Sequence, residues 1–312
     1  MSICRTAVRF GKYKERKMDM SLKQELTPAA LEALCRSIRM PESVTERVMA
    51  LADTYDFTAA ETFYQDLFSV ETGNAAVEGL KAVFGGENAD GLLMLTVMLA
   101  GALKARRDYE EKGIPEQIWL DTMGCFSRFV REDQVSYGHD CFTRAFWAYR
   151  QLSLKLFRIG TLEYEMTSLR DTGTEPGLQV QPGDPVLSVH IPSDALLTRE
   201  ELDASYAGAK AFFARFYPSY DYRCACCCSW LLSPSLKGLL PPDSRILLFQ
   251  SDFIPTGFYE DNGGYKTWLF KNGALEPENF PEDTSLQRRA KAFVLAGGKI
   301  GEGSGILRPE IL

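Results

Sequence analysis

The sequence has no apolar segment long enough to cross a membrane. Its longest apolar run, Gly91 to Leu103, has 13 residues, whereas a membrane-spanning helix needs about 20. The basic first residues are not followed by the apolar region of a secretory signal. We therefore expect a cytoplasmic protein without a membrane partner. In that reducing compartment its eight cysteines should be mostly free thiols.

Basic residues are in the minority. Lysine and arginine number 35 against 42 aspartates and glutamates, which gives a formal net charge of −7. Because binding to nucleic-acid phosphates requires a basic surface, we do not expect nucleic acid as the main partner. The hydrophobic content of 45% excludes wholesale disorder, and 312 residues suffice for two domains.

Only two histidines are present, so a histidine-based site can lie in few places. His139 follows a glycine at the expected start of a helix, where a surface or capping role is the simpler interpretation. His190 ends a predicted strand over residues 186–191, and open α/β sheets bind ligands at the carboxyl ends of their strands. Since imidazole ordinarily titrates near pH ~6.5, His190 is a candidate general base. The alternative is a structural histidine that fixes the following loop.

Four cysteines cluster in the C-terminal half. They are Cys224, Cys226, Cys227 and Cys228. A second pair with the spacing of a zinc site is missing from the sequence, so we expect no metal. Buried thiols pack as small apolar side chains, which is the simpler interpretation of the cluster. Cys228 remains a candidate nucleophile that would need a base such as His190. Ser229 is a candidate to hydrogen-bond a carbonyl or orient an acceptor.

The N-terminal half has the periodicity of successive helices. Thr27 followed by Pro28 is a typical helix start. The predicted helices begin at Pro28 and Pro41 and then cover residues 58–70, 89–112, 115–131 and 140–157. Glycines such as Gly73 are expected to terminate these helices or to form the turns between them. We expect residues 1–20 to be disordered and residues 21–158 to form an all-helical domain.

The pattern changes to that of alternating strands near Ile159. Strands are predicted over residues 161–166, 186–191, 222–232, 245–254, 265–271 and 305–307. Helices are predicted over residues 198–216, 233–240 and from Thr284 to about 296, with Thr198 and Thr284 as caps. The glycines and prolines of residues 171–185 indicate a loop. We therefore expect a mixed α/β domain over residues 159–312.

Four segments resemble a known bacterial family. They are Trp147 with RQLSLKLFRIGTLEYE (150–165), VLSVHIP (186–192), CCSWLLSPSL (227–236) and DTSLQRRAKAFVLAGGKIGEGSG (283–305). Together they are similar to a family whose members join a helical N-acyltransferase N-terminal domain to a GNAT-like C-terminal domain. The resemblance covers most of the chain, and it implies a fold and a class of reaction rather than a substrate.

The resemblance implies an enzyme that moves an acyl group from acyl-coenzyme A to the amine of a small molecule. GNAT domains hold acyl-coenzyme A between two splayed neighbouring strands, with the pyrophosphate at the N-terminus of the following helix. The cofactor contacts that this implies are Ser188, Val189, Ile191 and Ser193. The implied catalytic set is His190 as the base, with Ser229 and Cys228. Backbone amides over residues 188–191 would hold the thioester carbonyl.

One loop departs from the pattern of the family. The pyrophosphate loop of GNAT domains carries an arginine or glutamine followed by glycines, whereas residues 192–197 read PSDALL. Asp194, Glu200 and Glu201 add negative charge where the pyrophosphate is expected. The alternative function is therefore a GNAT-fold module that has lost catalysis and binds a small ligand or a protein partner. An open cleft between the strands over residues 186–191 and 222–232 would favour the enzyme.

Overall fold

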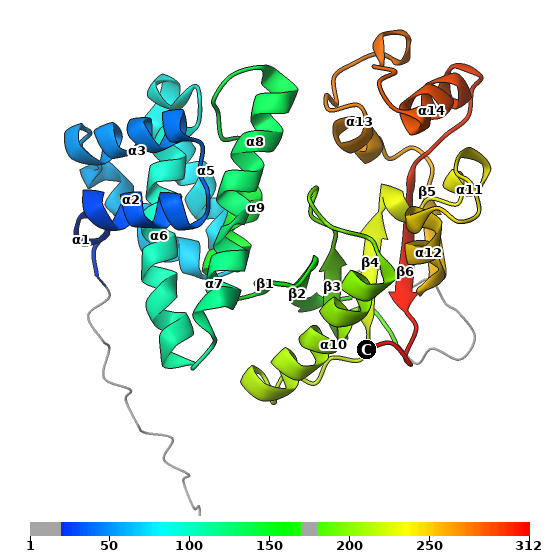
Figure 1. Ribbon diagram of the computed structural model, residues 1–312. Coiled ribbons are helices and arrows are strands. Elements are labelled where there is room, and N and C mark those ends of the chain that lie inside the picture. Colours follow the sequence, from blue (N-terminus) through cyan, green and yellow to red (C-terminus); the bar gives the residue numbers. More distant parts are fainter. Residues whose placement is uncertain (1–19, 170–179) are drawn as a thin grey trace, which may run out of the picture.

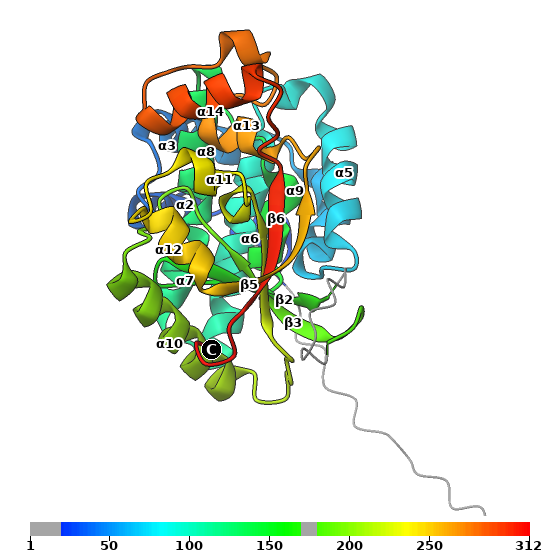
Figure 2. The ribbon, with the colours of Figure 1, turned by 90° about the vertical axis from the view of Figure 1, so that its right-hand side faces the viewer.

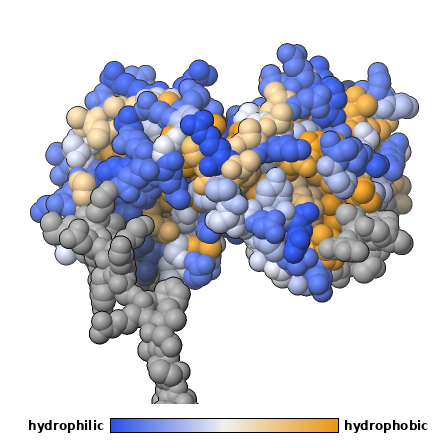
Figure 3. Space-filling model, turned by 90° about the horizontal axis from the view of Figure 1, so that it is seen from below, coloured by the Kyte–Doolittle hydropathy of each residue, from blue (hydrophilic) through white to orange (hydrophobic). Residues whose placement is uncertain are grey.

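The computed structural model describes residues 20–169 and 180–312. The residues predicted to be disordered, 1–20, lie outside these ranges except for Met20, as does most of the predicted loop over 171–185. Figure 1 shows one group of helices on the left and a sheet with its own helices on the right. Viewed from below, these two groups form two lobes joined at a narrower waist (Figure 3).

The helical half is built around one buried helix. Its helices are α1 (Leu22–Glu25), α2 (Pro28–Ser37), α3 (Glu42–Thr54), α4 (Glu61–Tyr64), α5 (Gly73–Phe84), α6 (Leu92–Glu111), α7 (Glu116–Met123), α8 (Cys125–Tyr137) and α9 (Ala145–Leu152). The apolar run of the sequence forms the first part of α6, which is buried on all sides from Leu92 to Ala102. Gly91 enters α6 with φ 76°, and a Cβ there would lie 1.9 Å from the carbonyl oxygen of Phe142. Glycine alone fits this position.

The C-terminal half contains a six-stranded mixed sheet. Its strands are β1 (Leu156–Ile159), β2 (Leu162–Ser168), β3 (Pro185–His190), β4 (Ala225–Ser229), β5 (Phe253–Tyr259) and β6 (Glu302–Leu307). Its helices are α10 (Arg199–Phe216), α11 (Leu236–Leu239), α12 (Arg245–Ser251), α13 (Gly264–Leu269) and α14 (Ser285–Leu295). Figures 1 and 2 both show α13 and α14 at one end of the sheet.

The strand order is β1-β2-β3-β4-β6-β5, and β3 and β4 are parallel neighbours at its centre. They pair only at Leu187 with Ala225 and at Ser188 with Cys226. Beyond these pairs β3 remains bonded to β2, and β4 to β6, as far as His190 and Ser229. The two halves of the sheet therefore separate at the carboxyl ends of β3 and β4.

The two faces of the sheet differ in polarity because side chains alternate along each strand. Leu187, Val189 and Cys227 are buried on the face that α10 covers with Tyr206 and Phe213. The opposite face carries the polar set Glu163, Glu165, Ser188, His190, Cys226 and Cys228, as the strand registers require. Helices α8 and α9 contribute Arg128, Trp147 and Arg150 to this polar face.

Several predicted elements of the C-terminal half are confirmed. The strands over 161–166 and 186–191 are β2 and β3, and the helices capped by Thr198 and Thr284 are α10 and α14. The last strand is longer than predicted and begins at Glu302. The strand predicted over 222–232 is shorter, because η4 (Trp230–Leu232) ends β4 at Ser229.

Two predicted strands are wrong. Residues 245–251 form α12, capped by the Ser244 side chain, and the strand β5 begins only at Phe253. Residues 265–269 belong to α13, which buries Tyr265 and Leu269 at helical spacing. A short apolar run can form either a strand or a buried helix, and in both segments the packing against the rest of the protein stabilises the helix.

The helical half also departs from its predicted boundaries. The helix predicted over 115–131 divides into α7 and α8 at Gly124, and the one over 58–70 is broken into η1 (Thr58–Ala60), α4 and η2 (Gln65–Phe68). The helix predicted over 140–157 ends at Leu152, and the strand β1 follows at Leu156. Gly73 begins α5 instead of ending a helix.

A buried ion pair joins the two halves. Arg128 of α8 donates to Glu163 of β2 at 2.6 Å, and both side chains are under 10% exposed. Burial disfavours the charged guanidinium, but the Glu163 carboxylate raises the pKa of Arg128 above its ordinary value. Strand β1 adds a second junction, because the Arg158 amide donates to the Thr122 hydroxyl of α7 at 3.0 Å.

Within residues 20–169 and 180–312, none of the helices has the length and hydropathy of a bilayer span.

Replacing Glu163 with methionine is expected to lower the free energy of unfolding by about 3 kcal/mol, because Arg128 would keep a buried charge without its closest partner. Chemical denaturation monitored by circular dichroism measures this change. Glu78→Gln is the matched control, since its pair with Lys81 is largely exposed, and it should change stability by less than about 1 kcal/mol. Equal effects of the two variants would contradict the importance of the buried pair.

Candidate active site

The separation of β3 from β4 produces a cavity between their carboxyl ends. This cavity, of about 420 Å³, is the throat. Val189, His190 and Ile191 line it from β3 and the residue that follows, and Cys228, Ser229 and Trp230 line it from β4 and η4. Trp147 lines it from the helical half, and Trp268 lines it from α13. The throat is therefore an open cleft between the two strands.

His190 lies in a network of fixed side chains. Its Nε2 is 2.9 Å from Oε2 of Glu165, whose other oxygen lies 3.1 Å from Nε of Arg150. The ring edge packs against Trp147 at 4.9 Å between centroids, and the Arg150 guanidinium lies 4.3 Å from the centre of the Trp147 ring. This set can hold one tautomer of the imidazole, with Nε2–H donated to the carboxylate and a lone pair left on Nδ1.

A second cavity, the groove, has a volume of about 450 Å³ and follows the polar face of the sheet. Its wall on one side is formed by Arg150, Glu165 and Ser188, and on the other by Thr256, Tyr259 and Ser304. The groove and the throat share three lining residues, which are Trp147, His190 and Cys228. His190 therefore stands where the two cavities meet.

The structure brings most of the sequence-predicted cofactor residues to the throat. Val189, Ile191 and Ser193 line it, whereas Ser188 lies one strand position earlier and lines the groove. The Ser193 hydroxyl donates to Glu132 of α8. The assignment of these residues to a cofactor stays a prediction.

The two further catalytic candidates are placed differently. Ser229 lines the throat, but its hydroxyl accepts the Leu231 amide at 3.2 Å and so caps η4. Cys228 is exposed and lies 3.9 Å from Oε2 of Glu302, which also accepts from Asn262 at 2.7 Å. Although the residue is exposed, its sulfur is partly buried, and this partial burial together with the nearby carboxylate of Glu302 raises the pKa of Cys228 to about 11. A thiol in this state is a weak nucleophile at neutral pH.

A third cavity adjoins the throat on the side away from the groove. It has a volume of about 810 Å³ and lies between α8, β1, the residues after α2 and the loop after β3; we name it the basic cavity. Five arginines and one lysine line it, against three carboxylates. They are Arg39, Arg128, Arg131, Arg144, Arg158 and Lys271, with Asp121, Glu132 and Asp194.

Sequence reasoning missed the partners of His190 and the basic cavity. Glu163 and Glu165 occupy alternate positions of a predicted strand, so the sequence could have predicted that they share one face of the sheet. The arginines of the cavity come from α8, β1 and two loops, and only the tertiary structure brings them together.

In the described parts of the chain, no three histidine, cysteine or carboxylate side chains are grouped as metal ligands would be.

Two family matches cover most of the chain. Residues 29–154 match the N-acyltransferase N-terminal domain, and residues 156–307 match the GNAT-like C-terminal domain. The chain therefore belongs to the acyltransferase family that joins these two domains in this order, as its sequence segments indicated. None of the curated proteins matches it.

Solved acyltransferase structures share the whole fold. One was solved with decanoyl-CoA and teicoplanin; it matches with a TM-score of 0.74 and 22% identity, over 88% of this chain and 86% of that chain. A second, a mutant acyltransferase in complex with octanoyl-CoA, matches with a TM-score of 0.75 and 22% identity, over 92% and 93% of the two chains. At this identity the likeness establishes a common fold that includes both halves.

The raised pKa of Cys228 makes a prediction for its chemistry. Iodoacetamide should alkylate Cys228 at pH 7.5 about tenfold more slowly than an unstructured cysteine, because little thiolate is present. The rate should keep rising until the pH approaches 11. Peptide mapping by mass spectrometry over a pH series measures it. A rate that levels off below pH 8 would mean that the thiol is activated.

Proposed function

We propose that the protein is an acyl-CoA-dependent N-acyltransferase with His190 as its general base. The observation that carries this proposal is the position of His190: it ends β3 where β3 and β4 separate, it is bonded to Glu165, and it faces both the throat and the groove. The acyltransferase structures with the same fold hold acyl-CoA, which supports a thioester as the donor.

In the proposed reaction the thioester lies in the throat and the acceptor amine enters from the groove. The amine nitrogen attacks the thioester carbonyl carbon, and Nδ1 of His190 takes the proton that the nitrogen loses. The C–N bond forms, the C–S bond breaks, and the leaving thiolate of coenzyme A takes the proton from the His190 imidazolium, which restores the base. Glu165 stabilises the imidazolium that forms, and Arg150 keeps the carboxylate in position.

Backbone groups support the carbonyl in this proposal. Beyond Ser188, the edge of β3 that faces β4 has no strand partner among the described residues. The Leu187 amide points toward β4, so the amides of Val189 and Ile191 continue this free edge. Within residues 188–191 these two amides are therefore assigned to the pantetheine arm and the thioester oxygen, together with Ser193. The open throat favours this enzyme over the alternative of an inactive binding module.

The groove suggests the nature of the acceptor. Its lining includes the hydroxyl groups of several serine, threonine and tyrosine side chains and the carboxylate of Glu165, which suit a polar small molecule that carries an amine. One neighbouring acyltransferase was solved with the glycopeptide teicoplanin. We propose a polar amine of this general kind as the acceptor.

The proposal extends to the organisation and location of the protein. We place a boundary near residue 158, with an all-helical domain before it and the GNAT-like domain after it. A cytoplasmic location is supported by the seven described cysteines, none of which is in a disulfide.

Replacing His190 with glutamine is expected to lower kcat about 10²–10⁴-fold, because the base is lost while the fold is kept. The assay is release of the coenzyme A thiol from decanoyl-CoA, with a panel of primary amines that includes a glycopeptide.

His139→Gln is the matched control, since His139 is exposed and contacts only the nearby turn. It should leave kcat unchanged. If His190→Gln melts at a lower temperature but turns over like the wild type, His190 is structural and the proposed base is wrong.

A further inference from the structure

The basic cavity has buried donors that the protein leaves unused. Arg128 is 8% exposed and donates through Nη2 to Glu163 at 2.6 Å. Its Nε and Nη1, and Nε of Arg144, have no hydrogen-bond partner among the described residues. Apart from Glu163, the nearest carboxylates are Glu132, 3.6 Å from Nε of Arg128, and Asp194, 3.9 Å from Nη1, and both are beyond hydrogen-bond distance. Oε2 of Glu132 is a buried acceptor that also has no hydrogen bond among the described residues, so three unsatisfied donor nitrogens stand against one unsatisfied acceptor. Buried donors without acceptors are costly, and this excess of donors indicates that an anionic ligand supplies acceptors.

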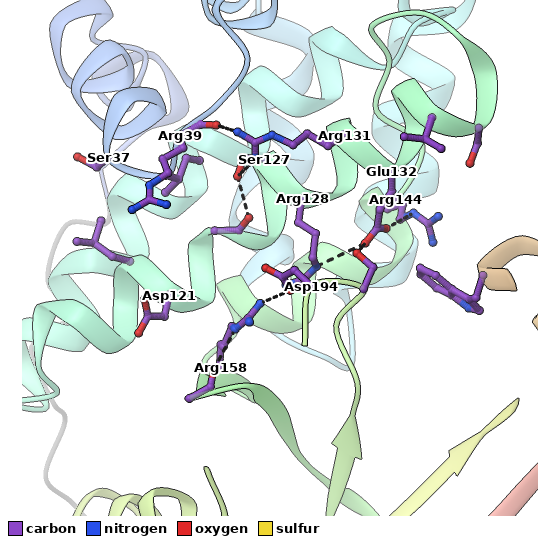
Figure 4. A pocket seen from close by; sticks show the side chains of 18 of the residues that line it. Ser37, Arg39, Asp121, Ser127, Arg128, Arg131, Glu132, Arg144, Arg158 and Asp194 are labelled. Carbon is purple, nitrogen blue, oxygen red and sulfur yellow. Dashed lines mark hydrogen bonds and ion pairs between the residues drawn. The ribbon is translucent and has the colours of Figure 1, made fainter. Parts of the chain in front are cut away.

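Two of the three carboxylates that line the cavity are already paired with cations. Asp194 lies 2.7 Å from Nη1 of Arg158, and Glu132 lies 3.4 Å from Nε of Arg144 and accepts from Ser193. Figure 4 shows these side chains converging on the cavity from α8, β1 and the loop after β3. The remaining cations therefore give the cavity a net positive charge, although the whole chain is acidic.

The start of α10, where the resemblance places the pyrophosphate, offers much less to an anion. Its one arginine, Arg199, is held by Asp252 at 2.7 Å and by Asp203 at 2.8 Å. Glu200 and Glu201 occupy the first turn, and the Thr198 side chain accepts the Glu201 amide. The loop that leads into this helix contains no glycine. A phosphate at this point would meet negative charge.

The basic cavity is continuous with the throat. Both are lined by Arg128, Glu132, Arg144, Ser193, Thr267 and Trp268. The Arg144 guanidinium lies over the Trp268 ring at 4.7 Å, so a side chain of the helical half and one of the C-terminal half meet at the passage. A ligand with its thioester in the throat can therefore extend its other end into the basic cavity.

We propose that the basic cavity binds the phosphates at the nucleotide end of coenzyme A. Arginine side chains, three of them from α8 and β1, take the place of the backbone amides that a glycine-rich loop would supply. This inference rests on the proposed function, and it adds that the helical half is required for donor binding. The acidic loop over residues 192–197 is then compatible with coenzyme A, because the phosphates lie beside it.

The test compares Arg131→Gln and Arg158→Gln with wild type in calorimetric titrations of the full chain. The probes are decanoyl-CoA, adenosine 3′,5′-bisphosphate, and the decanoyl thioester of N-acetylcysteamine, which has no phosphate. Each variant should weaken binding of the first two at least tenfold and leave the third unchanged. Arg158→Lys should retain most of the affinity for both phosphate probes. Arg128 is not replaced, because that would leave Glu163 buried without its partner.

Arg36→Gln is the matched control, because Arg36 is exposed and pairs only with Glu32 on its own helix; it should bind all three probes like the wild type. Melting temperatures verify that each variant is folded. If the wild type binds decanoyl-CoA and the cavity variants bind it equally well, the cavity inference is overturned and the proposed function stands. If the wild type binds neither decanoyl-CoA nor the thioester, the proposed function fails, and this inference fails with it.

Discussion

The short pairing between β3 and β4 is the constraint on which the rest of the site depends. Two parallel strands that share only two residue pairs leave backbone groups without partners at the centre of a sheet. Such groups must be satisfied, and a thioester ligand with an amide-containing arm can satisfy them. The same separation opens the throat and exposes the end of β3, so that His190 can reach a ligand from the polar face of the sheet.

The helical half completes this site. The buried pair between Arg128 and Glu163 fixes α8 against β2, and Trp147 and Arg150 of α9 hold the histidine and its carboxylate. The core is continuous across the junction, with Leu152 and Phe157 in the same apolar cluster. The proposed donor path begins in the basic cavity, passes through the throat and ends at the groove, and each part of it is lined by residues from both halves.

Much of the fold was readable from local patterns. The caps Thr198 and Thr284 correctly marked α10 and α14, and alternation correctly marked β2 and β3. The errors fell where local signals are ambiguous. The apolar run of α12 suits either a strand or a buried helix. After α9 the chain changes direction at Leu154, which has a φ of 53°, and no local sequence pattern predicts this left-handed conformation.

The candidate site was only partly readable. His190 could be singled out because histidine is scarce and the strand ends there, and Cys228 and Ser229 because they lie on the neighbouring predicted strand. Glu165 and Arg150 could not be joined to His190 without the register of β2 and the packing of α9. The glycine-free loop pointed away from coenzyme A, because the arginines that offset its charge are distant in the sequence.

A single-turnover experiment tests the central claim that the acyl group passes directly from the thioester to the amine. Excess protein is mixed with decanoyl-CoA, with and without an amine acceptor, and intact-protein mass spectrometry and thiol release are followed over time. The account predicts thiol release only when the amine is present, and a protein mass that never increases. A decanoyl group on the protein before the amine is added, at Cys228 or elsewhere, would contradict direct transfer.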